Sequence, residues 1–344
     1  MTNIQLRDQF LDIAKGLAII LVVVGHVIQG SAEKFDDLLW FRVIYSFHMP
    51  LFVFLSGSVA AIAFSPERIQ SGMLMVAKQV KTRLAKASIR LLIPFISWCV
   101  INQLFYHHSD SIVSAVLLAF RRPDTALWFL LAIFYCILLT CLFDIAFAGI
   151  YQLLQRCHMD RASHWIVDGR IQIVLIILIW WAIREHTPRG AGLSLIRPYF
   201  IYYMLGIGFY RYLYPKMDVW KYLPAIAIFM AAVPFWDRTN ANNILVLEGI
   251  SFIPEQLTYF YAGVVALSGS FVMFGLAKAI FYLRPIFFKR FLILSGQLSL
   301  GIYAMHYYFL EYSPKIIAPL VLGILLSTIL NKLPVIRTLL LGEI

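Results

Sequence analysis

The chain has 344 residues, of which 61% are hydrophobic and 14% are charged. Soluble globular domains carry about 25% charged residues, so this composition excludes an ordinary soluble domain and indicates a protein whose apolar surface faces lipid. The formal net charge is +11. In a membrane protein such an excess gathers in cytoplasmic loops, so we expect membrane lipids and no nucleic acid as partners.

Ten apolar runs have the length, or nearly the length, of a membrane-spanning helix, which takes roughly 20 residues. In chain order they cover residues 11–29, 40–63, 88–106, 126–148, 171–184, 194–210, 221–236, 256–277, 291–310 and 316–331. The first run lacks the small-residue cleavage site of a signal peptide, so we interpret it as a retained span. The pattern predicts an all-α polytopic transmembrane helix bundle of about ten spans, forming a single domain over residues 1–344.

The loops between these runs alternate in charge. If the N-terminus is cytoplasmic, most of the 29 Lys and Arg residues fall in cytoplasmic segments, and Asp36, Asp37 and Glu248 fall in the opposite loops. This asymmetry follows the positive-inside rule and predicts an even number of spans with both termini cytoplasmic. We expect a multi-pass protein of a bacterial inner (cytoplasmic) membrane.

Ionisable residues inside a span are costly, so each is a functional hypothesis. The first run carries Asp12, Lys15 and His26. Lys15 and His26 are eleven residues apart, about three helical turns, so both point to one face of the helix with about 16 Å between them. Lys15 lies near the cytoplasmic end of the predicted span and His26 lies toward the other end.

Two further runs carry a histidine. His48 and Ser56 lie in the second run, and Tyr303 and His306 lie in the ninth. A neutral histidine can act as a general base near neutral pH. Each histidine can equally be a structural hydrogen-bonding residue, and a proton-coupled transporter would use such histidines together with Asp12. The sequence has neither an HExxH motif nor Cys/His ligand spacing, so we expect no metal.

Together these residues resemble the membrane-bound acyltransferase family 3, particularly its fucose 4-O-acetylase-like branch. The resemblance covers essentially the whole chain and depends on the order and spacing of several segments. These segments are Leu11-Asp12-Ile13-Ala14-Lys15-Gly16 with Gly25-His26, Phe47-His48-Met49-Pro50-Leu51-Phe52 with Ser56-Gly57, Arg90-Leu91-Leu92-Ile93-Pro94, Leu127-Trp128-Phe129-Leu130, Tyr203-Met204-Leu205-Gly206, Ser299-Leu300-Gly301-Ile302-Tyr303 with His306, and Ile336-Arg337 with Gly342.

The resemblance implies about ten spans and an enzyme, an acyltransferase transferring groups other than aminoacyl groups. Its reaction is usually acetyl transfer from acetyl-CoA to a hydroxyl. The family's basic residue and histidine of the first span map onto Lys15 and His26. Much of the family has Arg where this chain has Lys15. A lysine ammonium cannot make the bidentate hydrogen bonds of an arginine guanidinium. The family also has a pair of basic residues before the third span. The second member of the pair maps onto Arg90. The first maps loosely onto Lys86, which precedes Arg90 by four positions, not the usual three.

The resemblance also implies roles for the remaining candidates. Basic residues of the predicted cytoplasmic loop would hold the acyl-CoA phosphates; they are Lys81, Arg83, Lys86 and Arg90. The alternative is that this loop only obeys the positive-inside rule. His26 would accept the proton of the acceptor hydroxyl. The other candidate catalytic residues are Lys15, Asp12 and His48. The candidate substrate-binding residues, some of them possible oxyanion donors, are Ser56, Trp128, Tyr303 and His306. A covalent acyl-histidine is a less favoured variant.

The expected acceptor is a hydroxyl of a cell-surface or exported glycan, or of its lipid-linked precursor. The sequence leaves open which glycan is modified, whether the acyl group is acetyl or succinyl, and the oligomeric state. One alternative is a multi-span transporter or exporter of a glycan or small molecule that uses intramembrane His and Asp. It would predict broken helices in corresponding halves, a pattern that the sequence lacks. Another is a non-catalytic sensing protein of the same fold, which would tolerate loss of His26.

Overall fold

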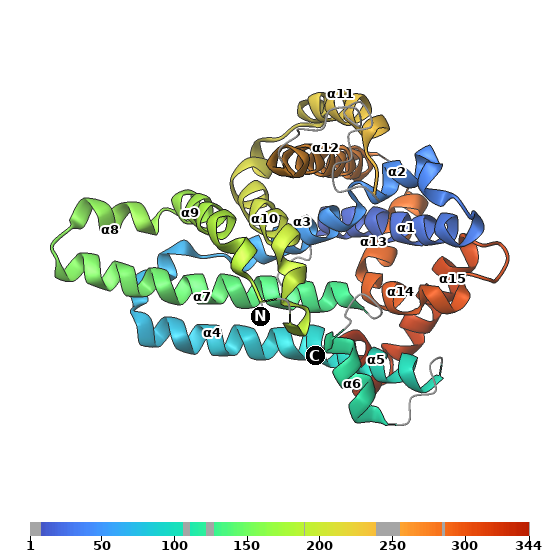
Figure 1. Ribbon diagram of the computed structural model, residues 1–344, viewed down its shortest axis with the longest axis horizontal. Coiled ribbons are helices and arrows are strands. Elements are labelled where there is room, and N and C mark those ends of the chain that lie inside the picture. Colours follow the sequence, from blue (N-terminus) through green and yellow to red (C-terminus); the bar gives the residue numbers. More distant parts are fainter. Residues whose placement is uncertain are drawn as a thin grey trace. The chain divides into compact units, whose positions relative to one another are not determined.

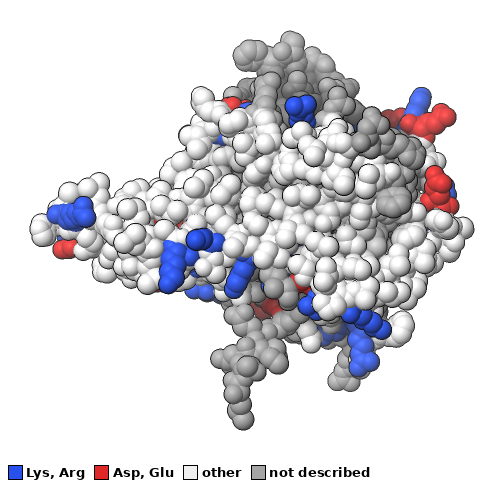
Figure 2. Space-filling model, turned by 90° about the horizontal axis from the view of Figure 1, so that it is seen from below, with Lys and Arg blue, Asp and Glu red and all other residues white. Residues whose placement is uncertain are grey.

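The computed structural model describes residues 8–105, 111–121, 127–188, 190–238, 255–283 and 286–343. Every element in these ranges is a helix (Figure 1). Many large apolar side chains are exposed, with Leu74 and Phe287 each 89% accessible. Figure 2 shows an outer surface that is mostly uncharged, with Lys and Arg in separate patches. These features confirm the predicted all-α membrane helix bundle.

Five described helices are long and apolar enough to cross a membrane, namely Gln9–Ser31, Leu39–Ala63, Met73–Leu104, Trp128–Arg156 and Leu257–Tyr282. Two pairs of bent helices, Asp160–Val167 with Gly169–His186 and Ile317–Leu330 with Pro334–Leu341, raise the number to seven if each pair is one span. The count of about ten spans and the cytoplasmic termini therefore stay predictions. The run expected over 291–310 is divided, because Leu298 separates two helices.

Contacts divide the chain into two compact units. The first comprises Met1–Leu55 and Leu213–Thr328, and the second comprises Ser56–Tyr212 and Ile329–Ile344. A single functional domain over residues 1–344 stays a prediction.

The first unit contains the N-terminal helix and most of the C-terminal helices. Its elements are α1 (Gln9–Ser31), η1 (Phe35–Asp37), α2 (Leu39–Tyr45), the first part of α3 (His48–Ala60), η9 (Tyr214–Lys216), η10 (Val219–Tyr222), α11 (Leu223–Ala232), η11 (Val233–Phe235), α12 (Glu255–Tyr282), α13 (Ile286–Gln297), α14 (Ser299–Met305), η13 (His306–Phe309) and most of α15 (Ile317–Leu330).

In this unit α1 packs directly against α13. A Cβ on Gly16 would overlap the carbonyl of Leu292, and a Cβ on Gly296 would overlap the carbonyl of Asp12. Glycines at such positions let two helix backbones touch, as is common in membrane helices. The next turns of α1 form a buried cluster with α14 and α15 that comprises Ile19, Val22, Val23, Leu298, Ile302 and Leu320. This packing fixes α1 against the segment that carries His306.

The second unit contains the middle of the chain and its C-terminal end. Its elements are the rest of α3, η2 (Ala61–Ala63), η3 (Pro66–Ser71), α4 (Met73–Ala87), η4 (Ser88–Leu92), α5 (Ile93–Phe105), α6 (Ile112–Arg121), α7 (Trp128–Arg156), α8 (Asp160–Val167), α9 (Gly169–Ile183), η6 (Arg184–His186), η7 (Gly190–Leu195), α10 (Ile196–Gly208), most of η8 (Phe209–Leu213), α16 (Pro334–Ile336) and η14 (Arg337–Leu341).

Within the second unit α4 lies along α7 (Figure 1). The chain end packs beside α5, where the indole nitrogen of Trp98 donates to the carbonyl of Leu340 over 2.9 Å. Gly342 has a φ of 65°, and a Cβ there would overlap the carbonyl of Arg90. Only glycine combines this backbone conformation with so close an approach. The C-terminal segment is thus held against the turn that carries Arg90.

Candidate functional site

The first turns of α1 hold a buried carboxylate that interacts with a lysine and an amide. The Asp12 side chain is 2% exposed and lies 3.6 Å, Oδ1 to Nζ, from Lys15, whose side chain is 25% exposed. The Gln297 amide at the end of α13 donates to Asp12 Oδ2 over 3.2 Å. Because Gly296 brings the two backbones together, Gln297 reaches α1. The structure thus unites the predicted Asp12 and Lys15, and adds Gln297, which the sequence did not indicate because it lies 285 positions away.

Further along α1, two of the three predicted histidines come together. The ring centroids of His26 and His306 are 5.1 Å apart. Tyr307 lies beside both, with its centroid 4.6 Å from that of His26 and 4.3 Å from that of His306. The buried core of α1, α14 and α15 creates this juxtaposition. His26 and His306 therefore belong to one cluster at a different level of α1 from Lys15.

Tyr45 lies between His48 and this cluster. The centroid of the Tyr45 ring lies 4.6 Å from that of His48, with the two rings tilted, and the Tyr45 ring meets the His26 ring edge-on at 6.2 Å. His48 Nδ1 lies 3.0 Å from the carbonyl oxygen of Ile44 and donates to it, because that oxygen can only accept. His48 is buried. A catalytic role for His48 stays a prediction, and Tyr45 is the residue that lies against both rings.

Three side chains surround the nitrogens of His26. Nδ1 lies 3.2 Å from Gln29 Oε1 and 3.2 Å from Tyr45 Oη. Tyr45 donates to Gln29 Oε1 over 2.7 Å. The hydroxyl of Tyr307 is 3.0 Å from each ring nitrogen. Sequence reasoning missed all three, although Gln29 lies one helical turn after His26 and Tyr307 is adjacent to His306.

The cluster combines a buried histidine, His306, with an exposed tyrosine, Tyr307. His306 is fully buried, and its Nδ1 lies 2.7 Å from the carbonyl oxygen of Tyr303. That nitrogen must donate, so Nε2 carries the lone pair, and within the described chain it has no hydrogen-bond partner. Tyr307, in contrast, is 53% exposed. A hydroxyl arriving from outside would thus meet Tyr307 first and two imidazoles behind it.

The predicted basic residues of 78–90 fall into two kinds. Lys81, Lys86 and Arg90 are exposed. The side chain of Arg83 is 25% exposed and its Nη1 lies 3.4 Å from Asp144 Oδ2. Three of the four candidates for phosphate binding are therefore at the surface of the second unit, and Arg83 is held by an ion pair.

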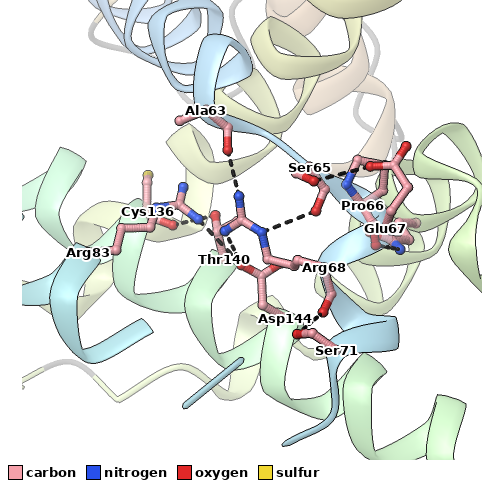
Figure 3. A network of polar contacts seen from close by, with 11 residues as sticks. Ala63, Ser65, Pro66, Glu67, Arg68, Ser71, Arg83, Cys136, Thr140 and Asp144 are labelled. Carbon is pink, nitrogen blue, oxygen red and sulfur yellow. Dashed lines mark hydrogen bonds and ion pairs between the residues drawn. The ribbon is translucent and has the colours of Figure 1, made fainter. Parts of the chain in front are cut away.

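Figure 3 shows the network around that ion pair. Asp144 of α7, 9% exposed, also pairs with Arg68 Nη1 at 3.6 Å. Arg68 donates to the carbonyls of Ala63 over 2.6 Å and Ser65 over 3.1 Å. Two guanidinium groups thus share one carboxylate and fasten the 3₁₀ turn η3 to α4 and α7. The sequence prediction did not single out this network, whose only signal was an acidic residue in the apolar run 126–148.

The remaining candidates are divided between the units. Tyr303 is half-buried, and its carbonyl accepts from His306 in the first unit. Ser56 and Trp128 belong to the second unit and are both half-buried. Trp128 begins α7 and packs on Tyr199 with ring centroids 5.4 Å apart. No group of three or more His, Cys, Asp or Glu suited to a metal occurs in the described ranges.

Comparison with known proteins places the chain in a family. A family model described as an acyltransferase domain matches residues 8–336. The chain is 28% identical over 277 residues to Nodulation protein NolL of Sinorhizobium fredii (strain NBRC 101917 / NGR234), a match that covers 76% of this chain and 66% of the relative. Nodulation protein NolL of Mesorhizobium japonicum (strain LMG 29417 / CECT 9101 / MAFF 303099) is 27% identical over 284 residues, covering 76% of this chain and 65% of the relative.

The chain thus spans just under two thirds of the length of these curated relatives. No solved structure matches it. The fucose 4-O-acetylase-like branch stays a prediction. The match over residues 8–336 covers both units and every candidate site residue. The chain therefore belongs to the membrane-bound acyltransferase family 3, as its sequence motifs predicted.

Proposed function

We propose that the protein is an integral membrane O-acyltransferase that moves an acyl group, most simply acetyl, from cytoplasmic acyl-CoA to a hydroxyl of a cell-surface or exported glycan or its lipid-linked precursor. The observation that carries the proposal is His26. It is an imidazole on an apolar helix, with Nδ1 beside Gln29 and Tyr45 and with the hydroxyl of the exposed Tyr307 lying 3.0 Å from each ring nitrogen. Family membership supports the reaction class.

His26 is the proposed general base. It takes the proton of the acceptor hydroxyl while that oxygen attacks the thioester carbonyl, which contributes about 10²–10⁴-fold to such reactions. The carbonyl oxygen then carries negative charge and requires hydrogen-bond donors. Tyr307 beside His26 supplies a hydroxyl for this purpose or for the acceptor. His306 is buried behind these residues and supports the site by packing its ring against those of His26 and Tyr307.

We assign binding of the acyl donor, acyl-CoA, to basic side chains that we expect on the cytoplasmic side of the membrane. The exposed Lys81, Lys86 and Arg90 are suited to the phosphates of CoA, because charge-assisted hydrogen bonds to phosphate are strong. Arg83 contributes positive potential from its ion pair with Asp144. Lys15 retains an accessible ammonium next to Asp12, which suits it to an anionic part of the donor. We place the protein in a bacterial inner membrane.

The test is mass spectrometry of surface glycans from cells that carry or lack the gene. The proposal expects a glycan present in equal amount in both, lighter by one acyl group per modified residue when the gene is absent. The size of the difference identifies acetyl or succinyl. An unmodified mass with a loss of total surface glycan would instead support an exporter and contradict the proposal.

A further inference from the structure

The nitrogens of His26 have different surroundings, which determine where its proton lies. Nδ1 is 3.2 Å from Gln29 Oε1 and 3.2 Å from Tyr45 Oη. The Tyr45 hydroxyl has one proton, and it donates that proton to Gln29 Oε1 over 2.7 Å. The amide oxygen has lone pairs only. Both neighbours therefore present lone pairs to Nδ1, and Nδ1 must carry the hydrogen.

Neutral imidazole has one N–H, so the lone pair lies on Nε2. The hydroxyl of Tyr307 is 3.0 Å from Nε2 and equally far from Nδ1. A hydroxyl equally far from both nitrogens lies off the in-plane lone pair of Nε2, so that lone pair stays available for the proton of a substrate. Tyr307 is 53% exposed, so the side of the cluster on which Tyr307 lies is the accessible one.

We propose that Gln29 and Tyr45 are positioning residues that hold His26 in the Nδ1–H tautomer, so that the unprotonated Nε2 accepts the proton of the acceptor hydroxyl. This inference rests on the proposed acyl transfer. A third group that orients a catalytic histidine is a general device of nucleophilic and acyl-transfer enzymes. Here an amide oxygen, supported by a tyrosine, takes that role.

The transfer step balances with this assignment. Nε2 takes the proton of the acceptor hydroxyl, and the oxygen forms a bond to the thioester carbonyl carbon. The carbon–sulfur bond then breaks, and the imidazolium returns the proton to the departing CoA thiolate. Throughout, Nδ1–H continues to donate to Gln29 and Tyr45, whose lone pairs stabilise the imidazolium.

Several titratable groups surround this histidine. Tyr45, Tyr307 and His306 are in ring contact with it, and His48 packs on the far side of Tyr45. Beyond Tyr45, Phe41 packs on its ring, and Arg238, which is paired with Asp36, lies over Phe41. A change at Gln29 alters the group that touches Nδ1 and leaves these neighbours in place.

The kinetic test uses membrane vesicles that contain the full chain, their endogenous acceptor and radiolabelled acetyl-CoA. We expect Gln29→Leu to lower kcat about 10²-fold with an unchanged KM for acetyl-CoA, because a reoriented base slows proton transfer. Gln29→Glu keeps an acceptor oxygen and should restore activity to within about tenfold of the wild type. Its carboxylate also favours the imidazolium, so the acidic limb of the pH–rate profile moves to higher pH. Gln70→Leu, at an exposed position of the second unit, is the matched control.

Two kinetic results would overturn the proposal. One is wild-type kcat in Gln29→Leu, and the other is a Gln29→Glu variant as slow as Gln29→Leu. The second result would mean that the amide donates its NH₂ group to Nδ1.

A spectroscopic measurement separates this proposal from the acyl-transfer assignment. Ring-labelled ¹³C,¹⁵N-histidine protein in lipid bilayers reports the tautomer of His26 by NMR, with signals assigned by difference from His26→Ala. We expect Nδ1–H in the wild type and a loss of that tautomer in Tyr45→Phe and Gln29→Leu. Protonated Nε2 in the wild type overturns the inference. Absence of acetyl incorporation with the Nδ1–H tautomer present would instead overturn the proposed function.

Discussion

Both units bury polar side chains among apolar helices, but they use them differently. In the second unit Asp144 meets two guanidinium groups, and Arg68 donates to two carbonyls. In the first unit His306 Nε2 has no partner in the described chain, and His26 Nε2 meets an exposed tyrosine. A satisfied network contributes to stability, whereas buried groups with spare hydrogen-bonding capacity indicate chemistry. The comparison predicts that substitutions in the two clusters have opposite effects on stability and activity.

Loss of Asp144 should give the largest change in stability. Asp144→Ala leaves Arg68 and Arg83 side by side without their carboxylate, and breaking a buried ion pair costs about 3–5 kcal/mol. We expect a marked fall in melting temperature and in yield of purified protein. Asp160→Ala on exposed α8 is the control. Equal melting temperatures for both variants would show that the Asp144 network is not a structural element.

His306 should show the reverse behaviour. His306→Asn keeps a donor for the carbonyl of Tyr303 but removes the ring nitrogen that has no partner. Because the His306 ring packs on the proposed base His26, we expect a misplaced base and a fall in acyl transfer of about 10²-fold, with a smaller change in stability than in Asp144→Ala. The measurement is acetyl incorporation alongside a thermal melt. Full activity would remove His306 from the site.

The close contact of α1 with α13 connects packing with the site. Gly296→Ala forces a methyl group onto the carbonyl of Asp12, and overpacking of this kind costs about 1–3 kcal/mol. We expect a lower melting temperature and a weaker hydrogen bond from Gln297 to Asp12. Gly30→Ala has open space around its Cβ and should have a small effect. Indistinguishable melts would contradict this packing.

The Asp36–Arg238 pair should give the smallest effect. Arg238 donates to both oxygens of Asp36 at 2.8 and 2.9 Å, and these hydrogen bonds hold the pKa of that carboxyl below its usual value. A lowered folded-state pKa contributes stability above the ordinary carboxyl pKa near 4, and this is lost as pH falls through the folded value. The pair is partly exposed, so its contribution is below about 1 kcal/mol.

Asp36→Asn should therefore lower stability slightly at pH 7 and leave it unchanged well below pH 4. The check is a pair of thermal melts at low salt at the two pH values. A larger difference at the acidic pH would reverse the predicted sign.

Sequence reasoning predicted the features that depend on local pattern. Apolar runs predicted the helical membrane class, and Asp12 and Lys15 of the first run were both singled out before the structure showed them as an ion pair. The family motifs named His26 and His306, which the structure brings into one cluster. Long-range partners could not be predicted, since pairs such as Tyr307 with His26 lie 281 positions apart. Charge alone also could not distinguish the paired Arg83 from the exposed Lys81.

The most direct test of the central claim is acetyl incorporation by His26→Ala in membranes from cells that lack the native gene. His164→Ala, an exposed histidine of α8, is the matched control, and both proteins are quantified in the membrane and by thermal melt. The account predicts that His26→Ala inserts and melts normally but transfers no measurable acetyl group, while His164→Ala behaves as the wild type. Retained incorporation in His26→Ala would contradict the assignment of His26 as the general base.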